Sequence, residues 1–228
     1  QLKEYHLAII PTIKLIDQSL EDEDGNKAHY YRFRLAKLYY YLGWFNNALD
    51  NLEYCQVYYR QNQNNIEYVR TCHMLAMVNL RLNNLEMANY FFGQTELEKP
   101  TINNPLLKFE HALLEIKLHK NKDDSLTEFK LLNVIKFARE NSLTDLSYES
   151  NNTLGDLYKE KGKIILACAA YEKALNICLS QHYLFEIGQL DLKIHECLTE
   201  QEHYKEANTR LLHYISVSDT LSKIKQNE

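Results

Sequence analysis

The sequence predicts an all-α protein built as a stack of helical hairpins, and three observations support that prediction. Its 228 residues include only 6 Gly and 3 Pro, fewer than average usage supplies. β-Hairpins and Gly-rich loops need those residues, so their scarcity favours long helices joined by short connections. Apolar residues recur at helical spacing, and one pattern of small and aromatic residues returns about every 40 residues.

The chain opens inside a helical pattern. Apolar residues are spaced along roughly Leu2–Leu20, and Pro11 within it is tolerated near a helix start or at a kink. The acidic run at 21–24, followed by Gly25, predicts a solvated connection. We therefore expect 1–24 to be the second helix of a truncated hairpin, in a fragment of a larger protein.

Five hairpins are predicted after this helix, over 28–60, 66–100, 105–141, 147–181 and 184–224. The clearest is the fourth, which reads Leu154-Gly155-x-x-Tyr158, then Gly162, then Ala167, Tyr171 and Ala174. We expect Gly155 and Ala167 where the two helices cross, because a larger side chain would hold the helices apart. Gly162 is expected to supply the positive φ that ends the first helix.

The small residue expected at the helix crossing recurs along the chain. It falls at Ala36, Ala76 and Gly155, and His195 takes its place in the last hairpin. Neighbouring positions are about 40 residues apart, with one interval of about 80. The hairpin at 105–141 is predicted to fill that longer interval.

These residues resemble the tetratricopeptide repeat family, whose pattern is Leu-Gly-x-x-Tyr on a first helix and Ala-x-x-x-Phe-x-x-Ala on a second. The resemblance covers nearly the whole chain after residue 28, with helices nearly a turn longer than usual for the family. Long-helix arrays of this kind resemble the ligand-sensing arrays of bacterial signalling proteins and transcription regulators. The fold implied is a right-handed superhelical array (an α–α superhelix) of about five hairpins, forming a single repeat domain over 1–228.

The resemblance also implies a binding surface, because in this family the first helix of each hairpin lines a concave groove. Here that groove would be basic and aromatic at one end, apolar in the middle and acidic at the other. An extended peptide would place its acidic part or C-terminal carboxylate near Lys37, Arg70 and Arg81. The predicted peptide- or partner-binding residues are Tyr30, Phe33, Lys37, Tyr41, Arg70, His73, Met77, Arg81, Phe109, Asn152 and Asp156.

No constellation in the sequence favours chemistry. The histidines lack zinc-finger or HExxH spacing, and neither a Gly-rich phosphate loop nor a Gly-x-Ser-x-Gly elbow occurs, so we predict no enzyme, cofactor or metal. The net charge of -5 gives no reason to expect contact with nucleic acid. No stretch approaches the roughly 18 apolar residues of a membrane span.

The cysteines bear on the compartment. The chain has 5 of them and no CxxC pair, which indicates buried reduced thiols and favours the cytoplasm. The periplasm stays open if the parent protein carries a removed signal peptide.

We therefore predict a non-catalytic protein- or peptide-binding domain that acts as the regulatory or sensor segment of a bacterial signalling protein. One alternative is the peptide-pheromone-binding domain of a transcription regulator, and another is a plain protein–protein interaction scaffold. A homodimer is an open alternative to a monomer, because helical arrays can bury their exposed ends against one another.

Overall fold

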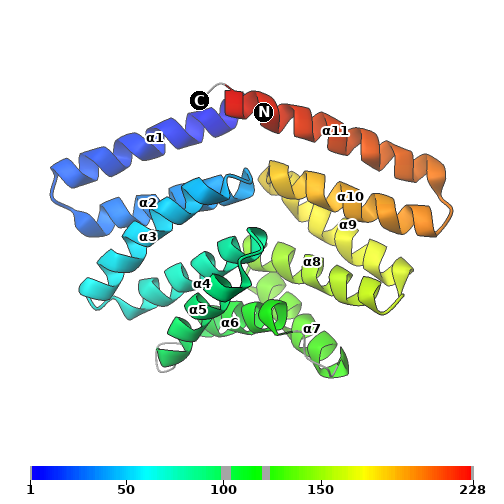
Figure 1. Ribbon diagram of the computed structural model, residues 1–228, viewed down its shortest axis with the longest axis horizontal. Coiled ribbons are helices and arrows are strands. Elements are labelled where there is room, and N and C mark those ends of the chain that lie inside the picture. The colour runs from blue at the N-terminus through cyan, green and yellow to red at the C-terminus, as the bar shows by residue number, and fades with distance from the viewer. Residues whose placement is uncertain (1, 99–103, 120–123, 227–228) are drawn as a thin grey trace. The chain divides into compact units, whose positions relative to one another are not determined.

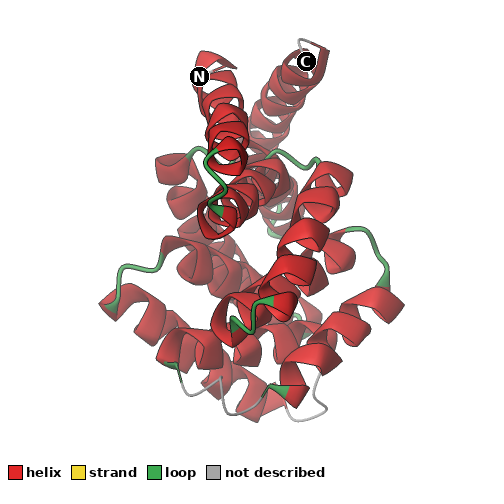
Figure 2. Ribbon diagram, turned by 90° about the vertical axis from the view of Figure 1, so that its left-hand side faces the viewer, coloured by secondary structure: helices red, strands yellow, loops and turns green. Residues whose placement is uncertain are grey.

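The computed structural model describes residues 2–98, 104–119 and 124–226, and every regular element within those ranges is an α-helix (Figure 2). The chain divides into two compact units, Gln1–Leu118 and His119–Glu228, which we call unit 1 and unit 2. Within each unit, consecutive helices run antiparallel and pack in adjacent pairs (Figure 1). The predicted all-α class, an array of tetratricopeptide-like hairpins, is confirmed.

The helices of unit 1 are α1 (Leu2–Glu21), α2 (Gly25–Tyr41), α3 (Phe45–Gln61), α4 (Asn65–Arg81), α5 (Leu85–Leu97) and α6 (Pro105–Leu118). Those of unit 2 are α7 (Asp124–Glu140), α8 (Thr144–Glu160), α9 (Ile164–Gln181), α10 (Leu184–Glu200) and α11 (Tyr204–Gln226). Pro11 lies inside α1. The boundary between the units falls within the hairpin predicted at 105–141, so that hairpin and the single domain stay predictions.

Each described turn between helices has the same form, in which the chain reverses over a few residues. One residue takes a left-handed conformation, and the amide of the next donates back to a carbonyl five residues earlier, as in the bond from Trp44 to Tyr39 at 2.8 Å. This is the Schellman arrangement that satisfies free carbonyls at a helix end. The donors are Asp24, Trp44, Asn64, Asn84, Leu143, Lys163, Tyr183 and His203.

The turns recur at a fixed interval because helix and turn have nearly the same length each time. The left-handed residues of unit 1 are Glu23, Gly43, Gln63 and Asn83, and those of unit 2 are Ser142, Gly162, His182 and Glu202. Successive positions in each unit are 20 residues apart. Gly162 has the positive φ predicted from the sequence, at 69°. Since two helices make a hairpin, this interval accounts for the sequence period of about 40 residues.

The small residues expected at the helix crossings are all buried. Ala36, Ala76 and Ala167 are wholly buried. Gly155 in α8 lies against the ring of Tyr171 in α9, so close that a Cβ on the glycine would approach two ring carbons to within less than 3.0 Å. The close approach of α8 and α9 at this point is therefore possible because Gly155 has no side chain.

His195 takes the place of the small residue in the pair α10–α11. Its Nδ1 lies 2.9 Å from the backbone carbonyl of Ala207 in α11, so Nδ1 carries the proton and donates to that oxygen. Ala207 is itself buried. The larger residue is thus accommodated because a side-chain hydrogen bond joins the two helices.

Candidate partner-binding surface

The even-numbered helices lie beside one another in each unit and make direct side-chain contacts. In unit 1, the guanidinium of Arg70 in α4 stands 5.5 Å from the ring centroid of Phe33 in α2. Further along, Arg81 Nε donates to the Tyr40 hydroxyl at 3.0 Å, and its guanidinium lies 5.5 Å from the Tyr40 ring centroid. Cations stacked on aromatic rings therefore join α2 to α4. We call α2, α4 and α6 the even-helix row of unit 1.

All the predicted binding residues lie on even-numbered helices, but they differ in how much surface they offer. Tyr30 is exposed, whereas Tyr41 and His73 are buried, with 6% of each residue accessible. The half-buried members in unit 1 are Phe33, Lys37, Arg70, Met77, Arg81 and Phe109. A partner laid on this row would therefore meet Tyr30 and the half-buried members more readily than Tyr41 or His73.

The predicted basic end is partly neutralised within the chain itself. Arg70 Nη1 donates to both carboxylate oxygens of Glu67, one turn earlier in α4, at 3.0 and 3.2 Å. Both side chains are about one-third exposed, at 35% and 30%. Such a pair contributes little to stability, so a ligand carboxylate can displace Glu67 at small cost.

The predicted acidic end lies in unit 2 and is also paired. Lys193 in α10 donates to Asn152 Oδ1 at 2.8 Å and to Asp156 Oδ1 at 2.5 Å, and both acceptors are in α8. Lys159 in α8 pairs with Glu196 in α10. These contacts join α8 and α10 and leave less negative charge than the sequence pattern suggested. They also use the side-chain oxygen with which Asn152 could have received a peptide amide.

Asp156 has a second partner in the neighbouring helix. The Tyr171 hydroxyl donates to Asp156 Oδ1 at 2.8 Å. Burial raises the pKa of Tyr171 well above its ordinary value, and the Asp156 carboxylate raises it further. The phenol therefore stays protonated and fixes the Asp156 carboxylate from one side while Lys193 fixes it from the other.

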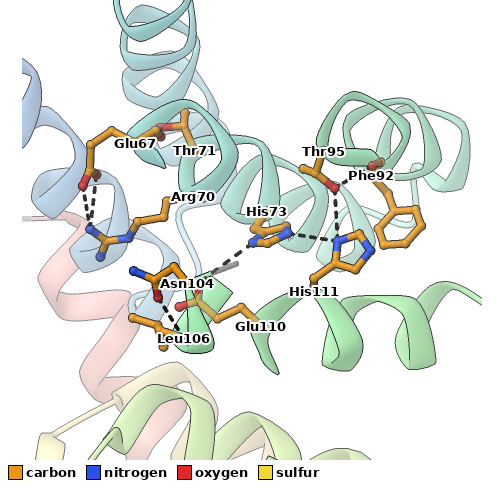
Figure 3. A network of polar contacts seen from close by, with 10 residues as sticks. All are labelled: Glu67, Arg70, Thr71, His73, Phe92, Thr95, Asn104, Leu106, Glu110 and His111. Atoms are coloured by element: carbon orange, nitrogen blue, oxygen red, sulfur yellow. Dashed lines mark hydrogen bonds and ion pairs between the residues drawn. The ribbon is translucent and has the colours of Figure 1, made fainter. Parts of the chain in front are cut away.

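The structure places a histidine pair on the even-helix row that the sequence did not reveal (Figure 3). His73 Nε2 in α4 lies 3.3 Å from His111 Nδ1 in α6, and His111 Nε2 lies 2.6 Å from the Glu96 carboxylate in α5. The His111 ring also stacks on Phe92 at a centroid distance of 4.6 Å. His73 and His111 are 38 residues apart, close to one hairpin period, and that spacing was the signal that could have found the pair.

The thiols are poor candidates for chemistry. All five cysteines are free, and all except the half-buried Cys168 are buried. Burial raises the pKa of Cys55 and of Cys72 to about 12, and that of Cys197 to about 11. Such thiols stay protonated near neutral pH and are weak nucleophiles.

The described residues contain no group of three or more His, Cys, Asp or Glu side chains arranged to hold a metal ion. None of the helices in the same ranges is both long and apolar enough to cross a bilayer.

Comparison with known proteins agrees with this geometry. Residues 148–180 match the family model described as tetratricopeptide repeat, and that range covers most of α8 and all but one residue of α9. No curated protein matches the chain. The hairpin α8–α9 therefore matches the tetratricopeptide repeat model directly.

Three solved structures share the fold at low sequence identity. One is a signal transduction ATPase with numerous domains from Pyrococcus horikoshii, PH0952, which has a tetratricopeptide repeat sensor: 15% identity, TM-score 0.58, covering 99% of this chain and 34% of that one. The second is BtubC (BKLC) from P. vanneervenii: 14% identity, TM-score 0.53, covering 96% and 92%. The third is the apo form of RapI: 11% identity, TM-score 0.55, covering 96% and 99%. This chain thus spans about a third of the length of the archaeal ATPase and nearly all of the other two.

Proposed function

We propose that this chain is a non-catalytic module that binds a protein or peptide and serves as the regulatory or sensor segment of a bacterial signalling protein in the cytoplasm. The observation that carries the proposal is the row of aromatic and cationic side chains across α2 and α4. In it the half-buried Arg70 stands over the half-buried Phe33, and the half-buried Arg81 is held against the buried ring of Tyr40. Aromatic and arginine side chains are those that most often dominate protein interfaces.

The two arginines suit an acidic group on the ligand. Each guanidinium is held in place by a ring, so less side-chain entropy is lost when it meets a carboxylate. Arg70 already shows this chemistry in its contact with the two oxygens of Glu67. A carboxylate of a bound peptide would replace Glu67 there or add to the bond that Arg81 makes with Tyr40.

The likeness to the archaeal ATPase supports the sensor part of the proposal. A chain of this size covers only 34% of that protein, whose repeat array is described as a sensor. A repeat array of similar fold can therefore work as one segment of a longer signalling chain. The peptide-pheromone-binding domain of a transcription regulator and a scaffold with no signalling output remain as the alternatives.

The test starts with a pool of random octapeptides carrying free C-terminal carboxylates. Peptides retained by the protein would be identified by mass spectrometry and measured by titration calorimetry. An Arg70→Gln/Arg81→Gln variant should bind them at least tenfold more weakly, because each charge-assisted hydrogen bond contributes about 1.5–3 kcal/mol. Arg139→Gln is the matched control, since Arg139 is an exposed arginine at the end of α7 in the other unit. Retention of no peptide by the unaltered protein would refute peptide binding.

A further inference from the structure

The histidine pair between α4 and α6 leaves one buried nitrogen without a hydrogen-bond partner. His73 Nδ1 has none, although only 6% of the residue is exposed. The nearest carboxylate oxygen is Glu110 Oε2 in α6, 3.8 Å away, which is too long for a hydrogen bond (Figure 3). A buried polar atom without a hydrogen-bond partner is destabilising and rare in folded proteins, so it calls for an explanation.

The protons of the pair follow from its contacts. His111 Nε2 faces the Glu96 carboxylate at 2.6 Å and must carry a hydrogen, because a carboxylate only accepts. Burial lowers the pKa of His111, and His73 lowers it further, while Glu96 and Glu115 act in the opposite direction. The His111 ring is therefore neutral near pH 7, and its Nδ1 carries a lone pair.

The lone pair on His111 Nδ1 determines which nitrogen of His73 carries a hydrogen. His111 Nδ1 lies 3.2 Å from the Thr95 hydroxyl oxygen, but that hydroxyl donates its hydrogen to the Phe92 carbonyl at 2.7 Å. His73 Nε2, 3.3 Å from His111 Nδ1, therefore donates the hydrogen of the bond between the two rings. A His73 ring whose hydrogen sits on Nε2 has a lone pair on Nδ1, and this nitrogen faces the Glu110 carboxylate. Two acceptors thus point toward the same space and cannot bond to one another, whereas a single donor placed between them would satisfy both.

The charge around the pair favours a cation as that donor. Glu96 and Glu110 contact the two rings, and Glu115 is near enough to influence His111. Three carboxylates therefore lie around the two imidazole rings. The Glu110 side chain is 31% exposed and that of His73 only 7%, so the carboxylate forms the solvent side of the pair.

We propose that His73 Nδ1 and the Glu110 carboxylate form a subsite for a primary ammonium group, such as the amino terminus or a lysine side chain of a bound peptide. An ammonium carries three hydrogens and one positive charge, so it can donate to both acceptors and offset the local negative charge. The link to a peptide rests on the function proposed above. It would place the amino end of the ligand at α4–α6 and the carboxylate toward α2–α4.

The test uses n-butylammonium as the probe and tetramethylammonium as a cation of equal charge that has no N–H. The protein, labelled with ¹⁵N in its histidine rings, would be followed by NMR at pH 7.5. In the free protein, we expect His73 to carry its hydrogen on Nε2 and none on Nδ1. Butylammonium should then shift the Nδ1 signal in a saturable way, and tetramethylammonium should leave it unchanged.

Two variants sharpen the result. Glu110→Gln should weaken butylammonium binding about tenfold, and Glu53→Gln, an exposed site on α3, should leave it unchanged. A hydrogen on Nδ1 in the free protein, equal responses to the two cations, or unaltered binding by Glu110→Gln would overturn the proposal.

Peptide measurements then separate the subsite from the proposed function. Acetylating the amino group of a retained peptide that lacks lysine should cost about tenfold in affinity. Peptides that bind equally well with and without the acetyl group would refute the subsite and leave peptide binding intact. A response to butylammonium with no peptide retained would refute peptide binding and leave the subsite intact.

Discussion

The substitution Gly155→Ala tests whether the helix crossing in α8–α9 depends on the absence of one side chain. The added Cβ would come closer than 3.0 Å to Cδ1 and Cε1 of Tyr171. That ring has little freedom to move away, because Tyr171 is wholly buried and its hydroxyl donates to Asp156 at 2.8 Å. The two helices must therefore separate, or the tyrosine must leave its position and lose that hydrogen bond.

The magnitude follows from two opposing terms. Replacing glycine by alanine inside a helix stabilises it by about 1 kcal/mol, because the unfolded chain has less freedom to lose. Overpacking a tight contact costs about 1–3 kcal/mol, and a lost hydrogen bond costs about 1 kcal/mol more. We therefore expect Gly155→Ala to lower the free energy of unfolding by about 1–3 kcal/mol.

Gly93→Ala is the matched control. Gly93 lies inside α5, and a Cβ added there meets no atom within 4 Å, so only the favourable helix term applies. This variant should be more stable than the unaltered protein by about 0.5–1 kcal/mol. Urea unfolding followed by circular dichroism measures both changes, and amide hydrogen exchange assigns each change to its unit. The reasoning fails if Gly155→Ala is as stable as Gly93→Ala.

Three further predictions concern titratable side chains. The Tyr158 hydroxyl donates to the Glu128 carboxylate and lowers the pKa of that carboxyl group below 4.5. The ionised carboxylate therefore adds to the free energy of unfolding above pH 4.5, and this contribution is lost as the pH falls through the pKa that Glu128 has in the folded protein. Glu128→Gln should cost about 1 kcal/mol in urea unfolding at pH 7 and less at pH 4, and an equal cost at both pH values would contradict this. The pKa of His111 in the folded protein lies below 6.5, so its neutral ring contributes to the free energy of unfolding above pH 6.5. That contribution should be lost as the pH falls through the pKa of the folded state. His111→Gln should reduce the drop in melting temperature between pH 7.5 and pH 5, and an undiminished drop would count against it. Cys55 and Cys72, with pKa values of about 12, should resist iodoacetamide at pH 8 until urea unfolds the chain, and rapid alkylation of the folded protein would rule this out.

The sequence was most informative where one residue determines a local geometry. Gly162 indicated a left-handed turn, and Gly155 with Ala167 indicated a close helix contact, because few other residue types fit those positions. Other turns could not be read in this way. Gln63 and His182 also have positive φ, although neither residue type signals it. There the position in the repeat sets the conformation, and the local residue does not.

The candidate site was harder to predict because its contacts join residues far apart in the chain. Nothing near Arg70 in sequence shows that it lies over Phe33. Its pairing with Glu67 is the exception, because residues three apart on one helix are neighbours. Lys193 did not enter the sequence argument, yet it binds both Asn152 and Asp156. Which residues fall on the even-numbered helices follows from the repeat, whereas their pairing depends on side-chain geometry.

The 20-residue interval between turns determines how such an array can change in length. Contacts between successive even-numbered helices join residues about one hairpin apart, such as Tyr40 with Arg81 at a separation of 41 and Lys159 with Glu196 at 37. Removing 40 residues from within one unit would leave the helix order, chain direction and contact register of its remaining helices unchanged. Removing 20 would turn each later helix of that unit end for end and put odd-numbered helices into the even row. Growth and loss in this kind of protein should therefore occur by whole hairpins, and a single-helix deletion should be far more damaging than one twice as long.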